Sequence, residues 1–323
     1  MQAQSRICLV SHAEDLDGLA SAALLARKFG VGKESIYFAD YSPQLLSFVF
    51  KKLRSRNCKA VFVTDLSVNE SKAKDWLKIL SSLRRKHTRI FWLDHHPWPE
   101  NAEAVAKLCD IAEYGENARY CATEIVANTL SIKDAYAKKL AKLVHMSDFA
   151  IKPKSRKDKM LLKAYDLAIA YANSMSIERK ESLLASMSME ISRGKLENER
   201  INKIASLFEK VSKKEIAKSL RRIYTVANVA VAFSSSKALF DELLEKLFEK
   251  SGKEVVIAVN VDRGKASIRS KKRDISGLAI AMHGGGHPHA AGFPVSGKYK
   301  LSSESGRMLF LKMLEKKIRK SLC

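Results

Sequence analysis

Short apolar runs alternate with longer amphipathic stretches in the first half of the chain. The strand-like runs occupy residues 7–10, 35–39, 60–64 and 89–93. Between them lie helix-like stretches at residues 19–29, 43–56 and 71–86, where apolar positions recur every three or four residues. Strands that alternate with helices predict a parallel sheet covered by helices on both faces. Past residue 94 the pattern becomes helical, over residues 123–130 and 133–146.

The second half changes character twice. Residues 159–220 show only helical periodicity, which predicts two or three helices with a break near residues 193–195. Strand-like runs then return at residues 226–233, 254–261 and 265–270. Helical patterns accompany them at residues 237–250, 275–282 and 306–320. The pattern predicts an α/β protein in which a parallel-sheet domain precedes a smaller α/β domain, with a helical linker between them.

Length and hydropathy agree with two domains. A chain of 323 residues exceeds the size at which a single core usually stops growing, and 46% apolar residues suffice for ordinary cores. No apolar run approaches the roughly 20 residues that a membrane-spanning helix needs, and the first residues lack a signal-peptide pattern. A soluble, cytoplasmic protein is expected.

The spacing of the five cysteines predicts neither disulfides nor a zinc site. They are odd in number, scattered, and contain no C-x-x-C pair, so neither a disulfide scaffold nor a zinc ribbon is indicated. All five are expected to be buried or incidental thiols: Cys8, Cys58, Cys109, Cys121 and Cys323.

The net charge of +23 is distributed unevenly. Residues 1–150 hold 22 Lys and Arg against 17 Asp and Glu, whereas residues 151–323 hold 36 against 18. A basic surplus of this kind favours a polyanionic partner, because neutralising phosphates releases condensed counterions. A lysine-rich surface that serves solubility is the alternative, and charge alone does not separate the two.

Acidic and imidazole side chains follow three of the predicted strands. The strand at residues 89–93 runs directly into Asp94, His95 and His96. The first strand is followed by His12, Asp15 and Asp17, and the third by Asp65. In open α/β sheets the carboxyl ends of the strands line the ligand crevice, so these side chains are expected to converge.

A metal site accounts for this set once Asp148, after a predicted helix, is added. Oxygen and imidazole ligands without a thiolate suit Mn²⁺ or Mg²⁺ better than a structural zinc site. Crowded carboxylates would repel one another without a cation, and two divalent ions could use them all, with Asp65 as the simplest bridge. Taken singly, Asp15 or Asp17 could cap the following helix, Asp65 could be a turn residue, and His12 or Asp148 could be solvated. For His95 and His96, two adjacent histidines that follow an acid at a strand end, no ordinary structural role of this kind is evident.

These motifs resemble those of the DHH-superfamily phosphoesterases. HAEDLDG at residues 12–18 is similar to the first motif of the family, VTDLS around Asp65 to the second, DHH at residues 94–96 to the third, and SD at residues 147–148 to the fourth. GGGHPHAAG at residues 284–292, preceded by SIRS at residues 267–270, resembles the signature of the DHH-associated C-terminal domain. In one respect the chain differs, because many members place the first-motif histidine one residue farther from its acids.

The resemblance implies domains and roles. Residues 1–192 would be the metal-binding catalytic domain, residues 193–222 a helical linker, and residues 223–323 a substrate-binding domain. The implied metal ligands are His12, Asp15, Asp17, Asp65, His95 and Asp148. His96 would face the phosphoryl group, and Asp94 would orient the histidines. The substrate would be held by Arg269, Gly284, Gly285, Gly286 and His287.

The expected activity is hydrolysis of short single-stranded RNA or DNA by a two-metal mechanism. Two Mn²⁺ ions are implied, with Mg²⁺ or Co²⁺ as alternatives. A phosphoesterase for cyclic dinucleotides or phosphoadenosine phosphate is a second hypothesis. A non-catalytic replication scaffold is a third hypothesis, which the complete ligand set disfavours. The oligomeric state stays open between monomer and homodimer, and no membrane partner is expected.

Overall fold

The chain folds into two compact units, Met1–Ala205 and Ser206–Cys323. The computed structural model describes residues 7–41, 43–68, 72–115, 119–149 and 151–322 of the chain. Each unit has a sheet and a core of its own, and helix α9 (Glu199–Ser219) crosses the boundary between them.

The first unit is built on a five-stranded sheet in the order β2-β1-β3-β4-β5, with every neighbouring pair parallel. The strands are β1 (Ile7–His12), β2 (Ile36–Ala39), β3 (Ala60–Thr64), β4 (Arg89–Leu93) and β5 (Ile111–Glu113). The sequence pattern predicted the first four, whereas β5, only three residues long and poor in β-branched side chains, gave no signal. The strand order reverses between β1 and β3, which is where open α/β sheets bind ligands.

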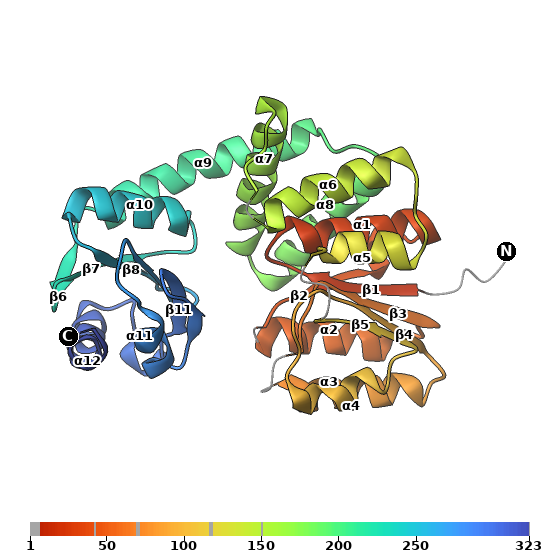
Figure 1. Ribbon diagram of the computed structural model, residues 1–323, viewed down its shortest axis with the longest axis horizontal. Helices are drawn as coiled ribbons and strands as arrows, with labels where there is room; N and C mark the ends of the chain where they lie inside the picture. The colour runs from red at the N-terminus through yellow and green to blue at the C-terminus, as the bar shows by residue number, and fades with distance from the viewer. Residues whose placement is uncertain (1–6, 42, 69–71, 116–118, 150, 323) are drawn as a thin grey trace. The chain divides into compact units, whose positions relative to one another are not determined.

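Helices cover both faces of this sheet (Figure 1). One layer holds α2 (Pro43–Ser55), α3 (Ala73–Arg84) and α4 (Glu103–Ala106). The other side carries α1 (Leu16–Phe29), α5 (Ala122–Thr129), α6 (Ala135–Asp148), α7 (Arg156–Asn173) and α8 (Ile177–Ser192). Short 3₁₀ turns lie at Lys33–Ser35 and Glu100–Ala102. The strands read as continuous apolar runs because both faces are buried.

The cysteine prediction was wrong for Cys8 and Cys58, which form a disulfide. Cys8 lies on β1 and Cys58 just before β3, and the parallel pairing of these strands brings the two Cα atoms to 5.9 Å. Fifty residues separate the two cysteines, so only the strand register could have paired them. Cys121 is a buried free thiol and Cys109 a partly buried one, as expected, and Cys323 lies outside the described residues.

The second unit contains a mixed six-stranded sheet in the order β10-β11-β9-β8-β7-β6. Its strands are β6 (Tyr224–Val226), β7 (Val229–Ser234), β8 (Val255–Asn260), β9 (Lys265–Ser270), β10 (Gly285–His287) and β11 (Ala290–Pro294). Only β7 and β8 pair in parallel; the other neighbours are antiparallel.

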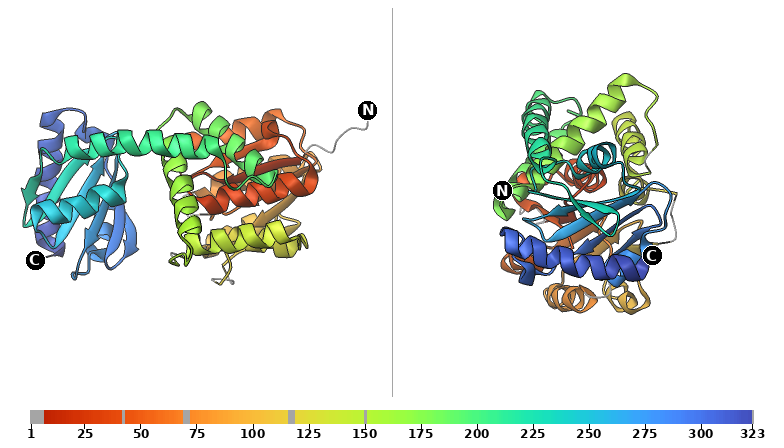
Figure 2. Two further views of the ribbon diagram at one scale, coloured as in Figure 1. Left: turned by 90° about the horizontal axis from the view of Figure 1, so that it is seen from above. Right: turned by 90° about the vertical axis from the view of Figure 1, so that its left-hand side faces the viewer.

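Alternating side chains of β7 build two cores. Val229, Val231 and Phe233 join the cluster under α11 (Ser276–Ala281) and α12 (Glu304–Ser321), while Ala230 and Ala232 face α10 (Phe240–Ser251). Figure 2 shows α10 and α12 on opposite sides of this sheet. A 3₁₀ turn at Gly297–Tyr299 precedes α12. The second domain is therefore also a layered α/β structure, as predicted.

Two details differ from the sequence-based expectation. The apolar run at residues 226–233 is not one strand but a hairpin, since Ala227 and Asn228 both adopt positive φ and reverse the chain between β6 and β7. Such a turn needs a left-handed backbone at both central positions, which Asn and Gly usually supply. Because alanine occupies the first of them here, the sequence pattern did not indicate a turn. The glycine-rich segment at residues 284–292, where the pattern predicted no strand, forms the hairpin β10–β11. Within the described ranges, each helix is too short or too polar to traverse a bilayer.

Candidate metal centre

The predicted ligands meet at one edge of the first sheet. Because β1, β3 and β4 are parallel neighbours, the segments that follow them leave the sheet at the same edge. Three groups of side chains there have ligand atoms within 4.8 Å of one another. Asp148, the last residue of α6, joins them from the helical layer. The structure thus assembles the motifs that the sequence keeps up to 136 residues apart.

The first group consists of His12, Asp15 and Asp65. His12 Nδ1 lies 2.9 Å from Asp15 Oδ2 and 3.6 Å from Asp65 Oδ2. The other oxygen of Asp15 accepts a hydrogen bond from the backbone N–H of Gly18 at 3.0 Å, so Asp15 also caps α1. The unusual spacing of the first motif therefore still brings the imidazole to both carboxylates.

Gly18 allows this loop to close. A Cβ atom at this position would lie 2.1 Å from the carbonyl oxygen of His12. No other residue fits, because that distance is far below van der Waals contact and the atom in the way belongs to the backbone.

The second group consists of Asp17, His95 and Asp148. His95 Nε2 lies 3.9 Å from Asp17 Oδ2, 3.7 Å from Asp148 Oδ2 and 3.5 Å from Asp65 Oδ1. Asp65 therefore lies between the two groups, where the bridging ligand was expected. Its φ of 54° is left-handed, a conformation that Asp and Asn adopt more readily than most residues.

Asp17 has a second role that the sequence did not reveal. Its carboxylate accepts hydrogen bonds from the backbone N–H groups of Ala122 and Thr123 at 2.7 and 2.8 Å, and from Thr123 Oγ1 at 2.5 Å. Asp17 thus satisfies the free donors at the start of α5. The predicted helix start near residue 123 indicated that the first backbone N–H groups of this helix would need an acceptor. No sequence pattern indicated that the acceptor would be Asp17, more than a hundred residues away.

Asp94 lies behind the histidines. It is fully buried, and its Oδ1 atom is bonded to His96 Nδ1 at 2.8 Å and accepts from the N–H of His95 at 2.9 Å. The indole of Trp98 donates to Oδ2 at 2.9 Å, and Trp98 stacks on Tyr114 with ring centroids 4.2 Å apart. This geometry is what an orienting carboxylate requires. Trp98 follows the triplet by two residues, yet sequence reasoning passed over it.

Crowding shifts the titration of the carboxyl groups. Burial, followed by the charge of Asp15, raises the pKa of Asp17 to about 6. Burial and the charges of Asp15 and Asp17 raise the pKa of Asp65 well above its ordinary value. Burial opposes protonation of His96, but its hydrogen bond to Asp94 and the charges of Asp94 and Asp65 together outweigh burial and raise its pKa. Without a cation, Asp17 and Asp65 therefore keep their protons to higher pH than free carboxyl groups do.

Three buried atoms in the centre lack hydrogen-bond partners among the described residues: His12 Nε2, Asp65 Oδ2 and His95 Nε2. Buried polar atoms are normally satisfied, so atoms of this kind gathered in one place call for a partner. Carboxylate and imidazole donors fit a divalent cation such as Mn²⁺ or Mg²⁺, and the arrangement contains no thiolate. The residues present therefore fit a metal centre.

The predicted substrate residues lie in the second unit. Arg269, on β9, donates from Nη2 to Asp241 at 2.9 Å. A Cβ atom at Gly284 would lie 2.0 Å from the carbonyl oxygen of Gly292, so Gly284 is required by packing, whereas a Cβ at Gly285 would meet nothing within 4 Å. Gly286 pairs with Ala291 in the hairpin, and His287 is exposed. The backbone at Gly285 and the side chain of His287 are thus both accessible.

Replacing Trp98 by phenylalanine should lower kcat about tenfold and leave KM unchanged, because Asp94 loses a donor and holds His96 less firmly. Steady-state kinetics of metal-dependent turnover measure this. Trp76→Phe is the matched control, since Trp76 packs edge-on against Trp92 in the core and lies outside the site. Equal losses in both variants would show that only aromatic packing matters.

The chain is similar to known proteins in one domain of its sequence and in its fold. The DHHA1 domain model matches residues 224–320. No curated protein sequence matches the chain. Among solved structures, RecJ from Thermus thermophilus in complex with Mn²⁺ is similar with a TM-score of 0.54 and 13% identity, over 95% of this chain and 52% of that one.

Two further structures have the same fold. An exonuclease RecJ bound to manganese gives a TM-score of 0.51 and 14% identity, over 97% of this chain and 91% of that one. The DHH domain of a member of a family of ribosomal proteins gives 0.55 and 16%, over 96% and 87%. These likenesses show that the chain has the same fold as the three solved structures, and the family match shows a DHHA1 domain at residues 224–320.

Proposed function

We propose that the protein is a Mn²⁺-dependent phosphodiesterase that hydrolyses short single-stranded oligonucleotides. The observation that carries the proposal is the group of buried, unsatisfied atoms on His12, Asp65 and His95 amid carboxylates of one edge of the sheet. A site of this composition is costly to bury unless a cation occupies it. The oligonucleotide substrate is supported by the basic surplus of residues 151–323.

The candidate ligands would hold two metal ions. His12, Asp15 and Asp65 would hold one ion, and Asp17, Asp65, His95 and Asp148 the other. When bound, the two ions would lower the pKa of a water nucleophile and offset charge on the phosphoryl oxygens. Mg²⁺ or Co²⁺ is compatible with the same donors.

His96 would contact the phosphoryl group. It is the more exposed histidine of the triplet, with 38% of its side chain accessible against 12% for His95. Its Nδ1 atom is engaged by Asp94, which leaves Nε2 for the substrate and favours the protonated ring. Asp94 would fix the ring, and neither residue has to act as a covalent nucleophile.

The DHHA1 domain would bind the substrate. The guanidinium of Arg269 can form a bidentate contact with a phosphate, and the open backbone at Gly285 can approach one closely, with His287 beside it. The ion pair of Arg269 with Asp241 costs little to break, because the Asp241 side chain is 83% exposed.

Arg269→Ala should raise KM about tenfold with little change in kcat, since a phosphate contact made equally in ground and transition states is lost. Asp241→Asn is the informative partner variant. It frees the guanidinium and should leave KM unchanged or lower it. An unchanged KM in Arg269→Ala would remove this residue from the substrate site.

The function is tested by incubating the protein with Mn²⁺ and a panel of phosphoesters. The panel contains end-labelled RNA of two to twenty nucleotides, single-stranded DNA, cyclic dinucleotides and phosphoadenosine phosphate. Stepwise shortening of the oligonucleotides supports the proposal. Selective turnover of the small nucleotides would replace it with a small-nucleotide phosphoesterase, and binding without any turnover would favour a scaffold.

A further inference from the structure

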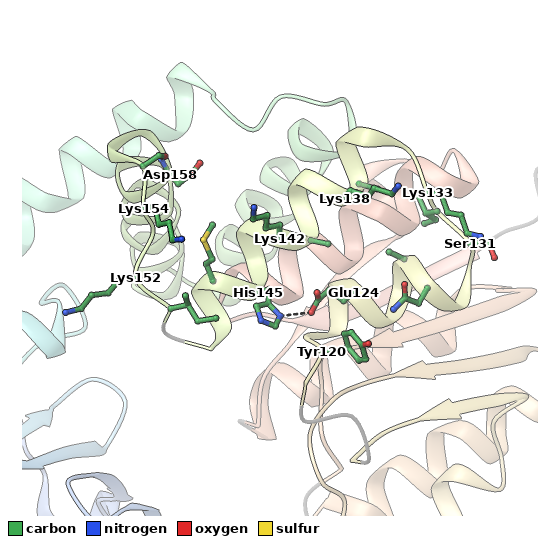
Figure 3. A pocket seen from close by; sticks show the side chains of 18 residues that line it. Tyr120, Glu124, Ser131, Lys133, Lys138, Lys142, His145, Lys152, Lys154 and Asp158 are labelled. Carbon is green, nitrogen blue, oxygen red and sulfur yellow. Dashed lines mark hydrogen bonds and ion pairs between the residues drawn. The ribbon is translucent and has the colours of Figure 1, made fainter.

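A cavity of about 910 Å³ lies in the first unit, outside the predicted ligand set. It is lined by α5, α6 and the segment at residues 151–158 (Figure 3). Its apolar lining comes from Ala127, Ile132, Ala137, Ala141, Met146 and Ile151. Tyr120 adds an aromatic ring at the edge, 43% exposed. No role in the metal centre accounts for this cavity.

The charged residues of the cavity are mostly basic. Five lysines line it: Lys133, Lys138, Lys142, Lys152 and Lys154. In the part of the chain that the structure describes, no carboxylate pairs with any of them. The two acids of the lining are Asp158 and Glu124, and Glu124 is occupied by His145 Nδ1 at 2.8 Å and by the N–H of Cys121 at 3.0 Å. The cavity therefore presents unpaired positive charge.

The lysines are spread along the cavity and do not converge on one point. Figure 3 shows Lys133 and Lys138 toward one end, Lys142 in the middle, and Lys152 and Lys154 toward the other. Helix α6 has 14 residues and is about 21 Å long, several times the rise of about 3.4 Å per stacked nucleotide. A single phosphate would need converging donors, whereas an extended polyanion suits cations in a row.

Helix α6 connects the wall of the cavity to the metal centre. His145 lines it, and Asp148 follows His145 by three residues on the same helix. The His145 ring packs on Phe149 at 4.5 Å, and Phe149 lies edge-on to His95 at 6.3 Å. His145 in the cavity wall is thus connected to His95 of the metal centre through the ring of Phe149.

From these contacts we propose that the α5–α6 cavity binds the backbone of single-stranded nucleic acid, holding nucleotides beyond the one at the metal centre. The lysines neutralise successive phosphates, while the apolar lining and Tyr120 take bases. The inference rests on the proposed function for the identity of the polymer. It adds that the first unit itself selects substrates longer than a dinucleotide.

The test compares Lys138→Gln/Lys142→Gln with Lys28→Gln/Lys139→Gln. Both double variants remove two exposed lysines of the first unit, but Lys28 and Lys139 do not line the cavity. Binding of a fluorescent 12-nucleotide RNA is followed by anisotropy in EDTA, which needs no turnover. Each lost phosphate contact should weaken binding about fivefold at 0.1 M salt and reduce the log–log salt slope by about 0.7. The cavity variant should therefore bind roughly twentyfold more weakly than the control.

A second readout is KM for the dinucleotide pApA, which should be the same in both variants. Equal binding of the 12-nucleotide RNA by the two variants overturns the inference and leaves the proposed function intact. A matching rise in KM for pApA in the cavity variant also overturns it, because the lysines would then serve the nucleotide at the metal centre. If RNA binding depends on Lys138 and Lys142 but nothing is hydrolysed, the proposed function fails and the binding site stands.

Discussion

Asp65→Asn should abolish turnover, by at least a thousandfold, and should make the metal-free protein more stable. Asp65 lies between the two ligand groups, so its loss weakens both at once. Without metal, however, it is a buried carboxylate beside Asp15 and Asp17, and their repulsion is relieved when asparagine replaces it. Asparagine also tolerates the left-handed backbone at this position.

The stability effect has a defined pH dependence. The folded pKa of Asp65 lies above its unfolded value, so the folded protein binds a proton that the unfolded chain releases. The contribution of this group is therefore full below the unfolded pKa and is lost as pH rises through the folded pKa. Asparagine does not titrate, so the advantage of the variant should grow with pH.

Thermal unfolding in EDTA between pH 4 and pH 8 measures this advantage. A gain of about 1–2 kcal/mol at the upper end corresponds to a Tm higher by several degrees. Asp75→Asn, at an exposed acid on α3, is the control that should change neither turnover nor the pH profile. Normal turnover in Asp65→Asn would refute the metal centre.

Mn²⁺ should raise the Tm of the protein strongly, and His95→Ala should remove most of that increase. A ligand that binds only the folded state stabilises it by about 2.7 kcal/mol at a hundred times its Kd. An ion in the centre would also bind the buried atoms of His12, Asp65 and His95 that lack hydrogen-bond partners. The gain should be steepest near neutral pH, where protons no longer compete for the carboxylates.

Calorimetry with increasing Mn²⁺, followed by EDTA, tests this second prediction. His289→Ala provides the comparison, because His289 is an exposed histidine of the second unit and lies outside the three ligand groups. If both histidine variants respond to Mn²⁺ like the parent, the ion binds elsewhere. RNA binding in EDTA should be nearly unchanged in His95→Ala, since the ring contributes to the metal site and not to the lysine row.

The sequence predicted most of the fold because its strands are short apolar runs bounded by turn residues. β1, β3 and β4 could be placed since both faces of each are buried and polar ligands follow at once. β5 could not, because a three-residue edge strand carries too little pattern. The glycines of β10 signal a turn as strongly as a strand, and the positive φ angles at Ala227 and Asn228 are imposed by the hairpin around them.

In the candidate site, too, local sequence features could be predicted and tertiary contacts could not. Residue type and position at strand ends sufficed to predict which side chains come together as candidate ligands, as for Asp65 and His95. Partners set by tertiary packing were out of reach: the indole of Trp98 on Asp94, and the donors of α5 on Asp17. The Cys8–Cys58 disulfide belongs with these, since strand register alone determines which cysteines meet.

The hydrogen bonds from Ala122 and Thr123 to Asp17 connect residues more than a hundred positions apart. A contact of such long sequence separation closes a large loop, and loop closure of this size comes late in folding. A collapsed intermediate that has its helices but not this contact would present His12 and Asp15 without Asp17 in place. Recovery of metal binding during refolding should therefore coincide with completion of the native topology. The amount of bound metal would then measure the fraction of fully folded protein.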